Sequence, residues 1–205
     1  MPDDFREDAL MSCLPTIDPH DGELTAVIET PKGSRNKYDY DERCHAFRLA
    51  GVMPEGTTFP YDFGFIPSTR GDDGDPLDVL IFLDAPTIVG CVLTVRLIGV
   101  IERKQREKNG TWVRNDRLLA VASRARTHKY LKKLSDLRPG LVDEIEAFFV
   151  HYNELNGKEF KPLDRGGPNR ARKLLDGGIS AFRGKAVDAR VGSSEESKQS
   201  STAAS

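Results

Sequence analysis

The chain has 205 residues, and its basic (30) and acidic (32) residues nearly balance, for a formal net charge of −2. Hydrophobic residues make up 38% of it, which allows a sizeable core and excludes wholesale disorder. The balanced charge excludes nucleic-acid binding through bulk positive charge, although it leaves room for a local basic site. No apolar run approaches the roughly 20 residues of a membrane helix, so we expect no membrane partner.

Composition divides the chain into three parts. Residues 1–21 are acidic and are predicted to form an arm over the surface. Residues 22–190 have the length and composition of one folded domain. Residues 191–205 are rich in serine, and we expect a disordered tail there.

The domain begins with short runs of β-branched and apolar residues. An Asn109-Gly110 pair lies between the last two runs and is a two-residue hairpin signal. Short strands with such turns predict a small antiparallel barrel or curled sheet. The predicted strands are Leu24–Thr30, Ala46–Leu49, Val79–Leu83, Val92–Ile101 and Leu118–Ala122.

Helical periodicity appears only later in the domain. Apolar residues between Leu141 and Leu155 recur on one helical face, and Gly157 follows the last of them. A second helix is predicted over Asn169–Phe182, although Gly177-Gly178 argues against its continuity. Strands followed by helices predict an α+β fold that is mainly β.

Three carboxylates come directly before a predicted buried strand, in the segment Asp73-Gly74-Asp75-Pro76-Leu77-Asp78. Positions two apart in an extended chain point to one side, and a bend at Pro76 can bring Asp78 to the same point. Oxygen ligands suit hard divalent cations, so magnesium is the expected metal. An acidic surface turn is the alternative, because Asp, Gly and Pro are ordinary turn residues.

Cations and further acids accompany this cluster along the chain. Metal-binding acids beside cations that hold oxyanions are the parts needed to bind a polyphosphate. The accompanying residues are Glu29, Lys37, Asp39 and Arg48 upstream and Asn115-Asp116-Arg117 downstream.

The motifs together resemble the soluble family I inorganic pyrophosphatases. The signature segment of that family is similar to DGDPLDVL at residues 73–80, with all three aspartates present. The resemblance covers roughly residues 24–182. Its other motifs follow in the same order: VIETP (27–31), KYD (37–39), Arg48, FPYDFGFIP (59–67) and FFVHY (148–152).

The resemblance implies a small closed five-stranded β-barrel of OB type with flanking C-terminal helices. It also implies Mg²⁺-dependent hydrolysis of pyrophosphate to two orthophosphates by a metal-activated water, in a homo-oligomer. The roles it implies are metal binding for Asp73, Asp75 and Asp78, proton abstraction from water for Asp75, phosphate binding for Lys37, Arg48, Arg117 and Tyr152, and support for Glu29, Asp39 and Phe63.

The chain departs from the family pattern at several of these positions. Phe59 and Phe63 stand where the family has tyrosines, and Asn153 stands where it has a phosphate-binding lysine, for which Lys158 or Lys161 could substitute. Alignment on the following strand places Asn115 on a metal-binding aspartate, with Asp116 as the alternative ligand if the backbone bulges.

A second aspartate of the family has no clear counterpart in this chain. Glu102 and Glu107 are candidates, but the segment ERKQREKNG (102–110) fits a solvated charged hairpin better. These losses predict an active but divergent enzyme.

Other classes of function stay open. One alternative is a divergent protein that binds phosphoanhydrides with little hydrolysis, or an OB-type binding module, for which the basic run at 124–133 is a weak signal. Another is a structural protein whose acidic turn holds calcium, which the cations Lys37, Arg48 and Arg117 argue against. We expect no nucleic-acid partner.

The cysteines and the amino terminus indicate a cytoplasmic protein. Cys13, Cys44 and Cys91 are scattered without a CxxC pair, which is typical of reduced thiols. The first ten residues, MPDDFREDAL, lack the basic and apolar regions of a signal peptide.

Overall fold

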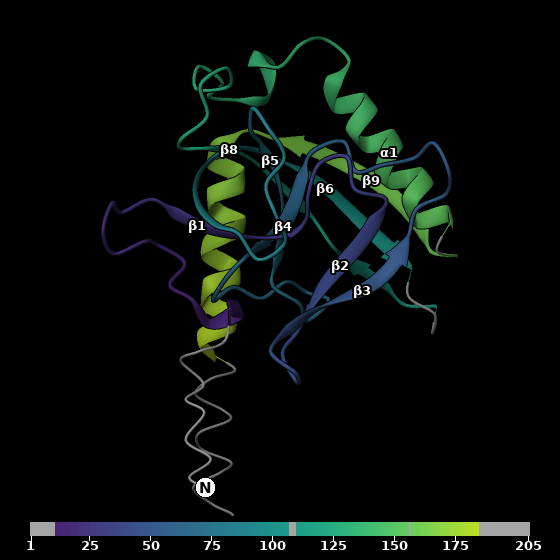
Figure 1. The fold of residues 1–205 in the computed structure, drawn as a ribbon, viewed down its shortest axis with the longest axis horizontal. Helices are drawn as coiled ribbons and strands as arrows, with labels where there is room; N and C mark the ends of the chain where they lie inside the picture. The colour runs from purple at the N-terminus through teal and green to yellow at the C-terminus, as the bar shows by residue number, and fades with distance from the viewer. Residues whose placement is uncertain (1–10, 107–109, 156, 185–205) are drawn as a thin grey trace, which may run out of the picture.

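A closed ring of five strands forms the centre of the molecule in the computed structural model, which describes residues 11–106, 110–155 and 157–184 (Figure 1). The strand β6 pairs with both β1 and β8 and so closes the ring. The predicted mainly-β, OB-like barrel is therefore confirmed. In ring order its strands are β1 (Leu24–Thr30), β4 (Asp62–Ile66), β5 (Leu77–Phe82), β8 (Arg117–Ala122) and β6 (Val92–Arg106).

Smaller elements extend the barrel on two sides. The strands β2 (Asn36–Asp41) and β3 (Ala46–Val52) form a separate antiparallel hairpin. The strands β7 (Trp112–Arg114) and β9 (Glu159–Gly166) both pair with the distal half of β6. There are also two short 3₁₀ turns, η2 (Met11–Cys13) and η3 (Leu134–Asp136).

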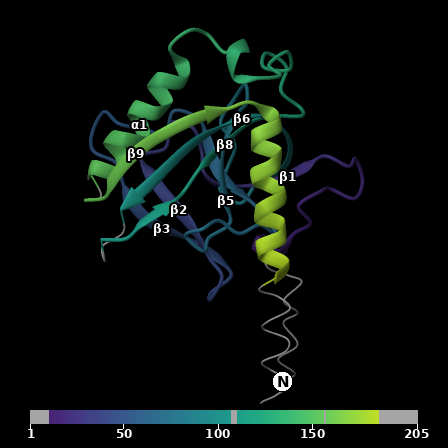
Figure 2. The ribbon, with the colours of Figure 1, turned by 180° about the vertical axis from the view of Figure 1, so that it is seen from behind.

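Two helices pack against the barrel. The helix α1 spans Leu141–Leu155, the bounds that the sequence predicts, and buries Ile145 and Phe149. Residues 168–184 form the second helix, which continues through the glycine pair. The β2–β3 hairpin lies in front of the barrel in Figure 1 and the 168–184 helix lies in front in Figure 2, so the two cover different faces.

The sequence prediction missed four strands, β2, β4, β7 and β9, and ended β3 and β6 too early. The strands β2, β4 and β9 carry charges, aromatic residues or a proline, and this composition hides the period-two pattern. The strand β6 runs to Arg106 rather than stopping at Ile101, because β7 and β9 pair with its charged half.

Gly64 explains why the aromatic segment before the acidic cluster contains a glycine. A Cβ atom built at this position on β4 would lie 1.8 Å from the backbone oxygen of Val27 on β1. The two strands therefore approach so closely that only glycine fits.

Parts of three predictions fall outside the described residues. They are residues 1–10 of the predicted arm, Asn109 of the hairpin signal, and the whole predicted tail at 191–205. Within the described residues, no helix is long and apolar enough to cross a membrane.

The glycine pair in the second helix gives a matched test of this packing. A Cβ atom at Gly178 would lie 2.6 Å from Leu77 Cδ1, whereas a Cβ atom at Gly177 would meet nothing within 4 Å. We expect Gly178→Ala to lower the free energy of unfolding by about 1–3 kcal/mol through overpacking. Gly177→Ala should raise it by about 0.5–1 kcal/mol, because alanine is the better helix former. Urea unfolding of both variants measures this, and a shift of both in one direction would contradict the packing.

Candidate active site

One cavity of about 1430 Å³ gathers residues from the β2–β3 hairpin, the loop before β5, the start of β8 and the end of α1. It brings together almost every residue that the sequence singles out, although they are far apart in the chain. The predicted residues that line it are Glu29, Lys37, Asp39, Arg48, Phe63, Asp73, Asp75, Asp78, Asn115, Arg117 and Tyr152.

The loop before β5 presents its carboxylates to this cavity. The backbone N–H of Gly71 donates to the carbonyl of Asp75 (2.7 Å), and that of Asp75 donates to Asp73 Oδ1 (3.3 Å). Burial and then the charge of Asp75 raise the pKa of Asp73 to about 6, and burial and then Asp39 raise the pKa of Asp75. The raised values show that burial and neighbouring carboxylates outweigh the nearby cations at both groups.

The donor atoms at Asp73 and Asp75 fit a hard divalent cation. Carboxylate oxygens are the ligands that Mg²⁺ prefers, and a bound cation would stabilise both ionised groups. As the side chains stand, no three His, Cys, Asp or Glu residues within the described ranges are grouped closely enough to hold a metal ion. The fit therefore concerns Asp73 and Asp75 rather than the whole cluster.

Asp78 differs from the other two aspartates because a cation already neutralises it. A guanidinium nitrogen of Arg117, Nη1, forms an ion pair with Asp78 and also donates to Asn115 Oδ1 (2.5 Å). The guanidinium lies 5.2 Å from the ring centre of Phe63 and 5.4 Å from that of Phe149. Arg117 therefore lies against two neighbouring aromatic rings, with Phe63 in place of the tyrosine that the resemblance implies.

Asp116 is the predicted site residue that does not line this cavity. Its Oδ1 accepts a hydrogen bond from the backbone N–H of Arg103 (2.9 Å), and its Oδ2 pairs with Arg114 (2.6 Å). The side chain faces a second cavity of about 800 Å³, which shares Asp73, Asp78 and Asn115 with the first. Of the two candidate ligands, the geometry favours Asn115.

Lys37 and Glu29 also line the cavity. Lys37 is ion-paired with Asp39, and Glu29 Oε1 accepts a hydrogen bond from the backbone N–H of Tyr40 (2.9 Å). Burial would lower the pKa of Lys37, but Tyr152, Asp39 and Glu29 together raise it above its ordinary value. Burial raises the pKa of Glu29 to about 7. This part of the cavity therefore carries a firmly held ammonium group.

Arg48 lies at the rim of the cavity on β3. Its Nη1 pairs with Asp41 (3.0 Å), and its side chain is largely exposed. Such an exposed pair costs little to break, so the guanidinium is available to an anion that enters the cavity.

Aromatic rings surround the phenol of Tyr152 at the end of α1. Its ring stacks on Phe148 with an interplanar angle of 16° and lies 5.8 Å from Phe59, centre to centre. Phe59 and Phe63 are both buried, so the two tyrosine hydroxyls missing from the family pattern are replaced by apolar packing.

The structure adds cavity residues that sequence reasoning missed or left open. Gln105 on β6 lines the cavity, and so do Asn153 and Lys158, of which Lys158 was one of two suggested replacements for the missing lysine. Lys161, the other suggestion, is exposed on β9. Asn153 is buried and donates through Nδ2 to the carbonyl of Phe149 (2.7 Å).

The charged segment after Ile101 is not the solvated hairpin that the sequence favours. Glu102, Arg103 and Gln105 are all buried, and Glu102 forms ion pairs with Arg114 and Arg170. Glu107, the other candidate there, lies outside the described residues. The two-residue spacing of Arg103 and Gln105 was the available signal, because alternate residues of a strand share one face.

The chain is similar to known proteins along most of its length. Residues 26–183 match the family model described as inorganic pyrophosphatase. An inorganic pyrophosphatase from Nostoc sp. is 36% identical over 165 residues, which cover 80% of this chain and 95% of that protein. One from Synechocystis sp. is 39% identical over 140 residues, covering 68% of this chain and 80% of that protein. The crystal structure of inorganic pyrophosphatase from Thermus thermophilus matches with a TM-score of 0.75 and 29% identity, covering 84% of this chain and 98% of that one.

The buried carboxyl of Glu29 predicts a measurable pH dependence of stability. A folded-state pKa of about 7, against an ordinary value of 4.5, means that folding favours the neutral acid. The stabilising contribution of the neutral Glu29 carboxyl is complete below pH 4.5 and is lost as the pH rises through 7. Glu29→Gln keeps the oxygen that accepts from Tyr40, so between pH 4.5 and 8 it should gain up to about 3 kcal/mol relative to the wild type.

Chemical unfolding with EDTA at several pH values measures this gain, with the exposed Glu55→Gln as the matched control. Equal pH dependence of Glu29→Gln and the wild type would show that Glu29 is ionised in the folded protein without cost.

Proposed function

This chain belongs to the soluble family I inorganic pyrophosphatases, and we propose that it hydrolyses pyrophosphate to two orthophosphates in a Mg²⁺-dependent reaction. The observation that carries the proposal is a single cavity lined both by the carboxylates Asp73 and Asp75 and by the cations Lys37 and Arg48. Such a cavity suits a substrate that is itself highly anionic and that arrives with a cation.

Asp73 and Asp75 would hold Mg²⁺ in this proposal. The ion would screen the charge of pyrophosphate and lower the pKa of a bound water towards neutrality. Asp75 would accept the proton of the attacking water, as the resemblance implies. The water oxygen bonds to one phosphorus while the bridging P–O bond breaks, and the departing phosphate keeps the electron pair of that bond.

The cations and the phenol of Tyr152 would position the substrate. Lys37 and Arg48 carry the charges that face phosphate oxygens, and Tyr152 adds a hydroxyl that can donate a hydrogen bond. Arg48 must exchange Asp41 for phosphate, which its exposed position permits. Asp39 holds Lys37 through their ion pair, and Glu29 supports the site from its edge by accepting a hydrogen bond from Tyr40.

The departures from the family pattern weaken metal binding on one side of the site. Asn115 offers an uncharged oxygen, and Arg117 already occupies that oxygen and Asp78. We therefore propose a higher Mg²⁺ requirement than a site with three free aspartates would have. The homo-oligomer, the cytoplasmic location and the domain limits at residues 22 and 190 remain predictions of the sequence.

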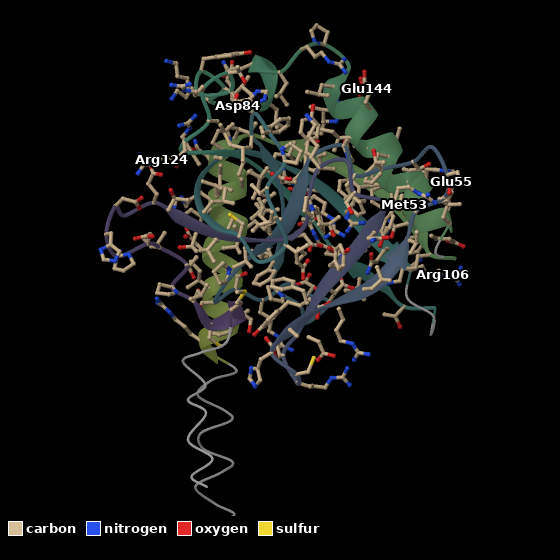
Figure 3. The ribbon with its side chains drawn as sticks, in the orientation of Figure 1. Met53, Glu55, Asp84, Arg106, Arg124 and Glu144 are labelled. Atoms are coloured by element: carbon tan, nitrogen blue, oxygen red, sulfur yellow. The ribbon has the colours of Figure 1, made fainter. Side chains whose placement is uncertain are left out.

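An OB-type binding module is less well supported. It would need one basic groove, but Figure 3 shows Arg124, which begins the basic run, and Arg106, which belongs to the other basic stretch, at different edges of the molecule. The run at 124–133 also forms turns around Asp84, whose Oδ2 accepts from the backbone N–H of Arg126 (2.6 Å). These basic residues therefore form no continuous groove.

Phosphate release from pyrophosphate with Mg²⁺ titrated from zero to millimolar concentration tests the proposal. The wild type should release phosphate only with Mg²⁺, and Asp75→Asn should be about 10²–10⁴-fold slower because it loses the group that accepts the proton.

Glu55→Gln removes an exposed carboxylate that does not line the cavity, so it should retain wild-type activity. Release by the wild type no faster than by Asp75→Asn, at every Mg²⁺ concentration, would rule out this activity.

A further inference from the structure

Arg103 is a fully buried cation whose guanidinium group makes no hydrogen bond within the part of the chain that the structure describes. Its side chain is 0% exposed, and none of its three guanidinium nitrogens has a partner among the described residues. Its guanidinium carbon lies 4.9 Å from the ring centre of Phe160 and 5.7 Å from that of Phe149. An unpaired buried charge is costly, so a nearby negative charge must offset it.

The negative charge that acts on Arg103 belongs to the acidic cluster. Asp73 has the largest favourable electrostatic effect on Arg103, followed by Asp116. Burial nonetheless lowers the pKa of Arg103 to about 9, so these carboxylates offset the cost only in part. Arg103 thus lies against Phe149, which lines the cavity, and its charge acts on Asp73 from outside the lining.

Arg117 is the neighbouring cation in the cavity wall. It is buried, with 7% of its surface exposed, and its Nη1 is shared between Asp78 and Asn115. Phe149 contacts both guanidinium groups, which lie 5.7 Å (Arg103) and 5.4 Å (Arg117) from its ring centre.

The rest of this wall carries amides rather than acids. Gln105 on β6, Asn115 before β8 and Asn153 on α1 all line the cavity. The wall therefore supplies two fixed positive charges and no free carboxylate at these five positions. A divalent cation carries the same charge as two guanidinium groups.

We propose that Arg103 and Arg117 are built-in counter-ions that take the place of one divalent cation at the acidic cluster. Asp73 and Asp75 remain open to a metal ion, whereas Asp78 and Asn115 are occupied by Arg117. The substrate-free protein therefore binds one divalent cation fewer than its carboxylates would otherwise accept. The inference rests on the proposed function, because it assigns roles at the same site.

Titration of the full chain with Mn²⁺, without pyrophosphate, tests the inference. Electron paramagnetic resonance of free Mn²⁺ gives the number of ions bound per chain and their Kd. We expect one ion in the wild type. Arg117→Met, which frees Asp78 and Asn115, should bind one ion more or bind with a Kd at least about tenfold lower.

Arg103→Met removes the second charge while filling the space between Phe149 and Phe160. It should bind Mn²⁺ severalfold more tightly than the wild type, since Asp73 loses its counter-ion. Arg165→Met is the matched control, because Arg165 pairs with Asp143 and Glu146 on α1 and lines neither cavity. Its Mn²⁺ binding should equal that of the wild type.

A folded Arg117→Met protein with wild-type stoichiometry and a Kd within about twofold of the wild type would overturn the inference, whatever Arg103→Met does. Circular dichroism checks the fold of each variant. Because the titration contains no substrate, failure here is distinct from failure of the proposed hydrolysis. If the wild type hydrolyses no pyrophosphate but Arg117→Met still binds more Mn²⁺, the proposed hydrolysis is contradicted and the counter-ion inference stands.

Discussion

The negative charge of the turn from Asp73 to Asp78 is the constraint on which this site depends. Three carboxylates at one partly enclosed cavity repel one another, and burial adds to the cost of ionising them. The protein meets this cost in two ways. Asp78 is neutralised by Arg117, and Asp73 and Asp75 keep raised pKa values that a bound cation would relieve. The site is thus divided into a side that carries its own cations and a side that is open to a metal ion.

Strand register places these groups together. The strands β5 and β8 run parallel, and their register places Asp78 opposite Arg117. The backbone pairing of the two strands therefore brings this ion pair together. The strand β6 pairs with β8 so that Ile101 lies opposite Arg117, which puts Arg103 two residues further along the same wall. The helix α1 then covers this wall with Phe149. The charge arrangement is therefore a consequence of the barrel geometry.

Much of this arrangement could be predicted from the sequence, because the parts that carry strong local patterns are also the parts that carry the motifs. The apolar face of α1 gave its bounds, and the motif order gave the barrel and the cavity residues. The second helix, predicted over Asn169–Phe182, is confirmed at residues 168–184. The glycine pair that argued against its continuity does not break it, and Gly178 has a packing reason, its close contact with Leu77.

The missed features all depend on long-range pairing. Glu102, Arg103 and Gln105 look like surface residues in sequence, and only the cover provided by β9 and α1 buries them. Asp116 looked like a possible ligand, but its oxygens are used by Arg103 and Arg114. No local pattern shows that Arg117 faces Asp78, because that contact depends on a parallel strand pair formed across the barrel.

The position of the metal ion is the most direct test of this account. An anomalous diffraction map of wild-type crystals grown with Mn²⁺ would locate it. If Arg117 neutralises its side of the site, the peak will lie beside Asp73 and Asp75, with the Arg117 guanidinium still between Asp78 and Asn115. A peak between Asp78 and Asn115, with Arg117 turned away, would contradict this account.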